Sequence, residues 1–330
     1  MTVLNNVASL AALDIPEEHN FVPAFSSAVT SYKLNVPAAT ASVTFTPTLS
    51  SPSDSTMTLN TAAATSGVAA PPMTINTSSL GTAATIVVTA ADGLTKQTYT
   101  LTILREPTIS VVSANGITNN AANLRGMVLT NGPTNTVSFE YGLTAAYGNT
   151  AEATPDSVSG TTSTLVSLPL TGLLPGQTYH YRVISDNTAF QFVSEDGTVT
   201  TLENSEVWRI GFFGNKFNSG AGADLNDPAK DSVVNLIKFA TGLNPLTAAT
   251  MPGSARIVGE TLEFTYTRNK SAVGEVGFAV KWSNTLEADS WSSEGVTETA
   301  VVDQGATELV TVSVPKGNGG FRFVRLEIVP

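Results

Sequence analysis

The feature that most constrains this chain is a two-residue alternation of apolar and hydroxyl side chains, clearest in TIVVTAADGLTKQTYTLTIL at 85–104. A β-branched run leads into an Asp-Gly turn, after which Tyr99, Leu101 and Ile103 alternate with threonines. Successive side chains of a strand point to opposite faces of its sheet. The stretch therefore predicts a β-hairpin with one buried face and one solvated face.

Charged residues are scarce and cysteine is absent. Charged residues make up 13% of the 330 residues, and the formal net charge is -11. This acidic balance disfavours partners such as nucleic acid and anionic membrane surfaces, and no apolar stretch is long enough for insertion into a membrane. The absence of cysteine excludes disulfides, thiolate catalysis and cysteine-based metal sites. The length suits two or three domains, and the Thr-rich composition predicts a mainly β fold.

The first third of the chain carries an ordered set of strand and turn signals. This order resembles the cadherin-like β-sandwich module of bacterial surface proteins over about residues 4–106, which implies a β-sandwich with a structural or adhesive role. The resemblance rests on Leu10 and Leu13, PAF at 23–25, YKLNVP at 32–37, AADG at 90–93 and TYTLTILR at 98–105.

A second sandwich is predicted after Pro107, because proline interrupts the strand pattern there. The segment LLPGQTYHYRVIS places Tyr179 where a tyrosine corner is expected, with Tyr181 and Val183 pointing inward along the same strand. The region from about 107 to 202 resembles a fibronectin type III-like domain of bacterial extracellular proteins. The resemblance rests on FEYG at 139–142, AYG at 146–148 and the segment at 173–185.

The last third changes character. A short helix is predicted over 205–213, with Ser205 as its N-cap and Trp208 and Phe212 on one face. Alternation then returns in three strands, which carry Leu262, Phe264 and Tyr266; Phe278, Val280 and Trp282; and FRFVRLEIV at 321–329. The last third resembles the C-terminal module at the end of large secreted proteins of environmental bacteria. The resemblance rests on Trp208-Arg209, the acid-rich helix with Asn244-Pro245, FTYTR at 264–268, WSNTL at 282–286 before Trp291, and RFVRL at 322–326.

The predicted fold is mainly β, with three β-sandwich-like domains in series and a short helical element before the last. The predicted division is a cadherin-like sandwich at 1–106, a fibronectin type III-like sandwich at 107–202, a helical linker at 203–250 and a C-terminal β-domain at 251–330.

The acid-rich segment ADLNDPAKDSVVNLIKFATG at 223–242 is the strongest candidate for a chemical site. Asp224, Asp227 and Asp231 place hard oxygen ligands close together, as calcium loops do. The segment resembles runs of the form Asp-Pro-Asp-x-Asp-Gly in similar C-terminal modules, and this resemblance implies a calcium site. Several positions depart from that pattern, because Ala229 replaces an aspartate, Lys230 and Ser232 replace glycines, and Lys238 replaces a glutamate. A lysine at that position repels a divalent cation.

The same segment also fits a purely structural role. Asp231 is predicted to cap a helix and Asp227 to brace the preceding turn. The apolar face of that helix consists of Val233, Leu236, Ile237 and Ala240, and Gly242 fits its left-handed end. On this interpretation the chain uses no cofactor, with calcium as the alternative.

Exposed aromatic side chains are the second kind of candidate site. Trp291, Tyr141 and Tyr147 are predicted ligand residues for polysaccharide, whereas Trp282 alternates with apolar residues and is predicted to lie in the core. Serine-nucleophile and phosphate-loop motifs are absent from the sequence. A hydrolase remains a third hypothesis, because paired carboxylates meet in space and not in sequence.

The expected function is that of a non-enzymatic, secreted or cell-surface structural or adhesive protein of a bacterium. The predicted partners are like subunits or other surface proteins, with polysaccharide as the alternative. One version is a fibre subunit that donates the apolar N-terminal residues Val3, Leu4, Val7 and Leu10 to a neighbour's sheet. The N-terminus lacks the basic region of a signal peptide, so an export signal would have to lie outside this chain.

Overall fold

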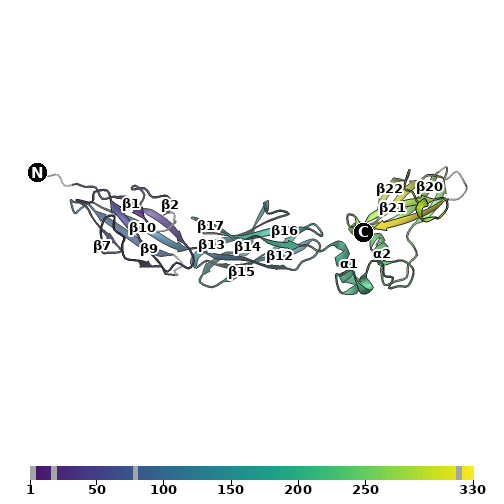
Figure 1. Ribbon diagram of the computed structural model, residues 1–330, viewed down its shortest axis with the longest axis horizontal. Coiled ribbons are helices and arrows are strands. Elements are labelled where there is room, and N and C mark those ends of the chain that lie inside the picture. Colours follow the sequence, from purple (N-terminus) through teal and green to yellow (C-terminus); the bar gives the residue numbers. More distant parts are fainter. Residues whose placement is uncertain (1–4, 16–20, 77–80, 260, 317–321) are drawn as a thin grey trace. The chain divides into compact units, whose positions relative to one another are not determined.

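The computed structural model describes residues 5–15, 21–76, 81–259, 261–316 and 322–330. The fold is mainly β, with 50% strand and 8% helix, which confirms the predicted fold class. The chain divides into two compact units. Figure 1 labels the strands and helices along the chain. Unit 1 comprises Met1–Ile117, Ala121–Thr171 and Thr178–Thr200, and unit 2 comprises Thr118–Asn120, Gly172–Gln177 and Thr201–Pro330.

Unit 1 begins with the strands of the first sandwich. A six-stranded sheet has the order β2-β3-β10-β9-β6-β7, and two small sheets pair β1 with β5 and β4 with β8. Strands β3 and β10 run parallel, whereas β9 and β10 form the predicted antiparallel hairpin. The strands are β1 Leu10–Asp14, β2 Phe21–Val22, β3 Ser31–Val36, β4 Ser42–Val43, β5 Thr46–Leu49, β6 Thr56–Leu59, β7 Ala62–Ala64, β8 Met73–Thr74, β9 Thr82–Thr89 and β10 Lys96–Arg105.

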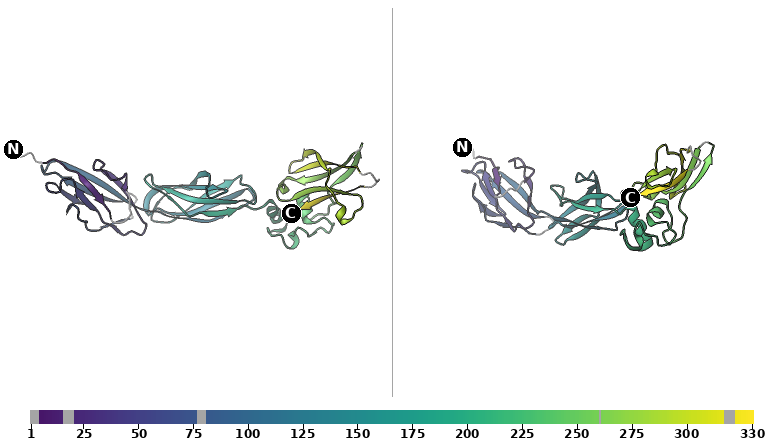
Figure 2. Two further views of the ribbon diagram at one scale, coloured as in Figure 1. Left: turned by 45° about the horizontal axis from the view of Figure 1, so that its top comes forward. Right: turned by 45° about the vertical axis from the view of Figure 1, so that its right-hand side comes forward.

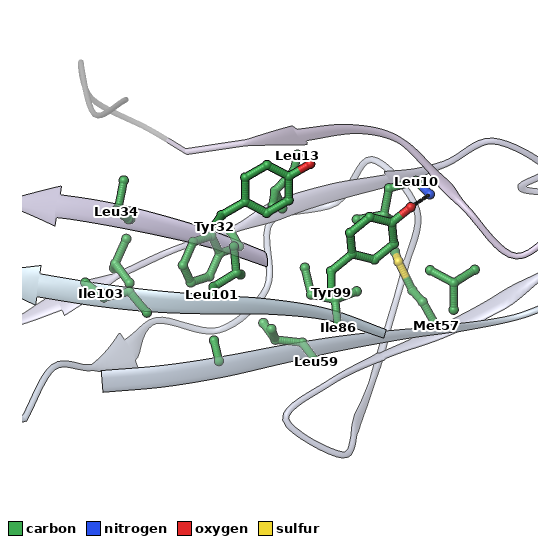
Figure 3. Packing of buried hydrophobic residues seen from close by; sticks show 14 of the residues in the cluster. Leu10, Leu13, Tyr32, Leu34, Met57, Leu59, Ile86, Tyr99, Leu101 and Ile103 are labelled. Carbon is green, nitrogen blue, oxygen red and sulfur yellow. Dashed lines mark hydrogen bonds between the residues drawn. The ribbon is translucent and has the colours of Figure 1, made fainter. Parts of the chain in front are cut away.

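The core of this sandwich is built from the predicted alternation. Tyr99, Leu101 and Ile103 of β10 are completely buried (Figure 3). The hydroxyl of Tyr99 accepts a hydrogen bond from the Leu10 amide at 3.0 Å and donates one to the carbonyl oxygen of Ser27 at 2.9 Å. Because buried hydroxyls need partners, this tyrosine connects β1 to the interior of the sandwich while adding a large apolar ring to its core.

The second set of strands in unit 1 forms one sheet of eight strands, in the order β11-β12-β15-β14-β13-β16-β17, with β18 also pairing with β16. Tyr179, Tyr181 and Val183 of β16 are buried, as predicted. The strands are β11 Thr108–Asn115, β12 Ala121–Leu129, β13 Gly132–Gly142, β14 Asn149–Gly160, β15 Thr164–Thr171, β16 Thr178–Asp186, β17 Gln191–Val193 and β18 Gly197–Thr200.

The strands of unit 2 form a four-stranded antiparallel sheet, β19-β20-β23-β22, and a two-stranded sheet, β21-β24. Phe264, Tyr266 and Val280 are buried, as predicted. Trp282, which was predicted to lie in the core, is only partly buried and packs against this cluster. The described part of the last strand begins at Phe323, and Phe321 lies outside the described residues. The strands are β19 Ser254–Val258, β20 Thr261–Asn269, β21 Gly277–Ser283, β22 Thr297–Asp303, β23 Thr307–Val314 and β24 Phe323–Val329.

Two α-helices precede these strands, α1 at Asn204–Phe213 and α2 at Asn235–Thr241. In both views of Figure 2 this green helical segment lies beside the yellow-green strands of unit 2, and α2 contacts β20 and β24. Short 3-10 turns occur at Gly220–Gly222, Lys270–Ala272 and Ala288–Ser290. None of the helices in the described residues has the length and apolarity needed to cross a bilayer.

Both predicted N-caps are wrong. Helix α1 is preceded by Glu203, so Ser205 lies inside its first turn. The N-cap of helix α2 is Val234, three positions after the predicted cap Asp231. The physical reason is that other groups of the fold accept the first-turn amides, which leaves Ser205 and Asp231 free for different contacts. The predicted C-terminal glycine is confirmed, because Gly242 has φ 75° and ends α2.

Candidate functional site

Asp231 forms a buried ion pair with Lys238, which lies seven residues later in the sequence, within α2. The Nζ atom of Lys238 lies 2.8 Å from Oδ2 of Asp231, and the exposed fractions of the two side chains are 0% and 7%. Lys238 also donates to the carbonyl oxygen of Thr247 at 3.3 Å. The carboxylate of Asp231 accepts from the amides of Val233 and Ala249 as well. Every oxygen of this carboxylate is therefore engaged by the protein itself.

The hydrogen bond from Lys238 holds the pKa of Asp231 well below its usual range, and the two backbone amides add to this effect against the cost of burial. The carboxylate is thus ionised at neutral pH beside a buried ammonium group. The site already contains one cation, supplied by the chain, at the position where the sequence pattern of relatives implies a carboxylate ligand.

Asp227 braces the turn before α2, as predicted. Its carboxylate accepts from the amides of Asp231 at 3.2 Å and Ser232 at 2.7 Å. Lys230 and Ser232 have φ values of 58° and 68°, which lie in the left-handed region that favours glycine. The turn therefore has the backbone geometry of a glycine-containing loop, although this chain carries side chains at both positions.

Asp224 belongs to a separate ion pair. Its Oδ1 atom lies 2.7 Å from the guanidinium of Arg209, and its Oδ2 atom accepts from Asn218 at 2.7 Å. Its carbonyl oxygen accepts the Leu236 amide, which is one of the first-turn amides of α2. Asp224 thus connects α1 to α2.

The three aspartates therefore have different partners. Within the residues that the structure describes, no group of three or more His, Cys, Asp or Glu side chains is placed to hold a metal ion. The calcium site on Asp224, Asp227 and Asp231 stays a prediction for a binding measurement.

A pocket of about 510 Å³ in unit 2 is lined by the helical segment, by the loop at 274–276 before β21 and by Pro330. Glu275 reaches the start of α1, where its two carboxylate oxygens accept from the amides of Asn204 at 2.5 Å and Ser205 at 2.9 Å. Such a carboxylate stabilises the positive end of a helix. The other charged residues that line the pocket are two cations, Arg209 and Lys216, and three acids, Glu203, Glu206 and Asp224. The exposed ring of Phe217 also lines the pocket.

Sequence reasoning missed this pocket, because its walls come from segments about 70 residues apart. Glu206 accepts from the Glu203 amide at 3.0 Å, so the sequence ENSE did contain the two acidic ends of a capping arrangement. That signal locates the start of α1 but does not reveal Glu275, which reaches the helix only through the tertiary fold.

Two of the three predicted aromatic ligand residues have a guanidinium over the ring. Arg325 lies 4.2 Å from the ring centre of Trp291, and Arg182 lies 4.7 Å from that of Tyr147. The Tyr147 hydroxyl donates to Asp196 at 3.1 Å. Burial, and to a smaller extent this hydrogen bond, raises the pKa of Tyr147. Tyr141 is half-buried in β13. Trp291 belongs to unit 2 and the two tyrosines to unit 1.

Tyr147 lies in a polar cluster on the outer face of β16. His180 lies 2.8 Å from Asp196 through its Nδ1 atom, and Arg182 lies 2.7 Å from Glu140. The predicted outward direction of His180 and Arg182 is confirmed, because both side chains are partly exposed. The other histidine, His19, lies outside the described residues.

Residues 8–106 match the family model of the cadherin-like beta sandwich domain. A search of the curated proteins found no match. Among solved structures, the sensor domain of the anti-sigma factor RsgI4 in Pseudobacteroides cellulosolvens is 24% identical, with 29% of this chain and 89% of that chain covered and a TM-score of 0.23. A segment of two fibronectin type III domains from chicken tenascin is 17% identical, with 59% of this chain and 99% of that chain covered and a TM-score of 0.27. The chicken CNTN1 FN1-FN3 domains are 13% identical, with 51% and 65% covered and a TM-score of 0.25.

The family match confirms the predicted resemblance to a cadherin-like β-sandwich over residues 8–106. The similar solved structures include fibronectin type III domains. Such folds host many unrelated functions, so the match defines architecture and leaves function to be argued from the sites.

Proposed function

We propose that the chain is a non-enzymatic structural or adhesive protein of a bacterial surface. The observation that carries this proposal is the cadherin-like sandwich at residues 8–106. In addition, the aspartates of the acid-rich segment are bound to lysine, arginine and backbone amides of the same chain. Serial sandwiches provide reach, and the hydroxyl-rich outer faces of their strands stay solvated. The proposed location is outside the cell.

The described carboxyl groups whose pKa is shifted are bound by partners within the chain. In the described chain the carboxyl pKa values that depart from normal are all lowered, by hydrogen bonds from Thr95, Lys238, Lys270 and Lys281 respectively, at Asp92, Asp231, Asp303 and Glu327.

One form of this role is a fibre subunit that donates its N-terminal segment to the next sheet. Leu10 is completely buried in its own sandwich and pairs with Leu49, so the donated residues must precede it. Val7 is 38% exposed and is a candidate donor residue. Val3 and Leu4 lie outside the described residues.

Electron microscopy of the intact chain and of a variant lacking residues 1–9 tests this form. Filaments are expected from the intact chain and a loss of filaments from the shortened one. A shortened chain that assembles as well as the intact chain would exclude donation by this segment. A Val7→Ser variant, matched with Val68→Ser at another exposed valine, checks that the effect belongs to the donor residue.

A second candidate function is polysaccharide binding. It is favoured by the 510 Å³ pocket of unit 2, where an exposed aromatic ring, Phe217, stands beside paired carboxylates and cations. Aromatic rings and charged hydrogen-bonding groups are the usual lining of such sites. Glycan-array binding that is reduced by Phe217→Ala or Trp291→Ala, and unchanged by Leu94→Ala at an exposed turn in unit 1, would support it.

A further inference from the structure

Two edge strands of unit 2 are exposed along their whole length. Strands β19 and β22 end the sheet order β19-β20-β23-β22, so each has one side on which the described residues place no neighbouring strand. All five residues of β19 and all seven of β22 are exposed. Among the described strands of three or more residues, these are the two in which every position is exposed.

The cause of this exposure is the narrow second sheet. The opposing sheet consists of β21 and β24, and α2 contacts β20, so the buried core of the four-stranded sheet lies under β20 and β23. Ile257 of β19 pairs with Leu262, and Val301 of β22 pairs with the buried Val310, which places both on the core-facing side. Yet Ile257 is 71% exposed and Val301 is 43% exposed. The core-facing side of the four-stranded sheet therefore carries exposed apolar side chains on both edge strands, beyond the area that the opposing elements cover.

The other side of β22 is apolar as well. Val302 pairs with Leu309 on the opposite face of the sheet and is 55% exposed. Edge strands are usually protected from intermolecular pairing by lysine, proline, bulges or a covering element. Neither SARIV nor TETAVVD contains lysine or proline. The protection present is a bulge between Glu298 and Ala300 in β22 and a single Arg256 in β19.

Strand direction allows the two edges to join. Every pair in the sheet is antiparallel, so β19 and β22 at its two ends run in opposite directions. A second copy with the same orientation therefore presents its β19 antiparallel to the β22 of the first. The hydrogen-bonded ladder then continues from one copy into the next without a change of pattern.

Charge favours joining unlike edges over like edges. Strand β22 carries Glu298 and Asp303 and no cation, whereas β19 carries Arg256 and no acid. Within the unit, Arg256 pairs with Glu263, Asp303 with Lys270 and Glu298 with Arg268. The side chains of Arg256 and Asp303 nevertheless remain 72% exposed. Two β22 edges would place acids against acids, and two β19 edges would place guanidinium against guanidinium. Like charges across a strand pair are destabilising.

We propose that the β22 edge of one chain pairs with the β19 edge of a second copy, in a head-to-tail contact. The partner is another molecule of this chain. The contact goes beyond the proposed function, because it makes no use of the N-terminal segment and does not depend on it. Strands twist by about 20 to 25° relative to their neighbours, so a repeat of four strands rotates by roughly 80 to 100°. A rotating head-to-tail contact produces a helical filament or a closed ring.

Two lysine substitutions, each of which blocks one edge, test this contact in the full-length chain. Val302→Lys blocks β22 and leaves β19 intact, and Ile257→Lys does the reverse. Leu94→Lys is the matched control, because Leu94 is 86% exposed and lies in a turn of unit 1. Molar mass is measured by sedimentation velocity over a range of concentrations. Far-UV circular dichroism and the melting temperature verify that each variant is folded.

The wild-type chain and the Leu94→Lys variant are expected to assemble as concentration rises, and each edge variant alone is expected to stay monomeric. In a 1:1 mixture, the Ile257→Lys variant supplies an unblocked β22 edge and the Val302→Lys variant an unblocked β19 edge. The mixture is therefore expected to form dimers and nothing larger. If either variant is unfolded, Ala300→Lys and Ala255→Lys replace the pair, because both alanines are exposed on the same strands.

Three results would overturn the contact. The first is a wild-type chain that remains monomeric at all concentrations. The second is assembly that survives both edge variants. The third is one edge variant that assembles alone while the other stays monomeric, which would indicate pairing of like edges. Loss of assembly on removal of residues 1–9, with both edge variants unaffected, would support the N-terminal donor instead.

Discussion

The ammonium group of Lys238 lies 2.8 Å from Oδ2 of Asp231, and the Lys238 side chain is completely buried. This single pair explains why α2 begins later than the sequence predicts, because Asp231 is bound to Lys238 and Ala249 and not to the first turn of the helix. It also places a fixed positive charge inside the segment that resembles a calcium loop.

Lys238→Met is expected to destabilise unit 2 strongly. The substitution keeps the apolar stem of the side chain but leaves the neighbouring carboxylate buried without its cation. Removing one partner of a buried pair costs about 3 to 5 kcal/mol, and Lys238 has no exposed surface. Urea unfolding measures the effect. Lys270→Met is the matched control, because Lys270 forms an exposed ion pair, so little change is expected. Equal effects in the two variants would contradict this interpretation.

The stability contributed by Asp231 should depend on pH in one direction. Its pKa is lowered in the folded chain, by the Lys238 hydrogen bond first, while the unfolded value is about 3.9. The contribution is therefore complete above about pH 5 and is lost as the pH falls through the folded value. The difference in unfolding free energy between wild type and Asp231→Asn should stay constant from about pH 7 to 5 and shrink below about pH 4. A difference that grows on acidification would contradict the sign.

Calcium is expected to leave the melting temperature unchanged. The Lys238 ammonium repels a divalent cation at Asp231, and Asp224 and Asp227 are bound to other groups. Melting curves in calcium and in chelator, together with isothermal titration of calcium into the chain, check this. Saturable binding that is lost in Asp227→Asn would instead support the calcium interpretation of the sequence.

Gly142→Ala is expected to destabilise the second sandwich. A Cβ atom at Gly142 would lie 1.6 Å from the carbonyl oxygen of Tyr147, so the loop after β13 would have to move. Overpacking of this kind costs about 2 to 3 kcal/mol. Gly211→Ala is the matched control, because no described atom beyond its chain neighbours and the backbone of α1 itself lies within 4 Å of its Cβ position. There the change should stabilise by up to about 1 kcal/mol through helix propensity. Chemical unfolding distinguishes the two signs.

Lys230→Gly is expected to stabilise the turn before α2. Lys230 has φ 58°, a conformation that costs a residue with a Cβ about 1 to 2 kcal/mol. Part of this gain is lost to the greater freedom of glycine in the unfolded chain, so a net increase of up to about 1 kcal/mol is expected. Ala229→Gly, at the preceding position without a positive φ, should lower the stability. Thermal unfolding of both variants provides the measurement, and a loss in Lys230→Gly would contradict the expectation.

The sequence by itself determined the strand content, the buried faces and the class of the first sandwich. Tyr99, Leu101 and Ile103 alternate in a pattern that only a strand can bury on one side, and the structure buries all three. Local patterns of period two need no knowledge of distant residues. The end of α2 at Gly242 was predictable for the same reason, because a left-handed residue favours glycine wherever it occurs.

The tertiary structure decided which side chains form ion pairs, which groups cap the helices and which strand edges are exposed. Glu275 reaches the start of α1 from about 70 residues away, and Asp231 pairs with Lys238 when it could equally have capped a helix. The exposure of Ile257 and Val301 follows from the width of the opposing sheet, which no single strand encodes. Helix caps, ion pairs and free edges depend on the positions of several elements at once, so local sequence patterns cannot specify them.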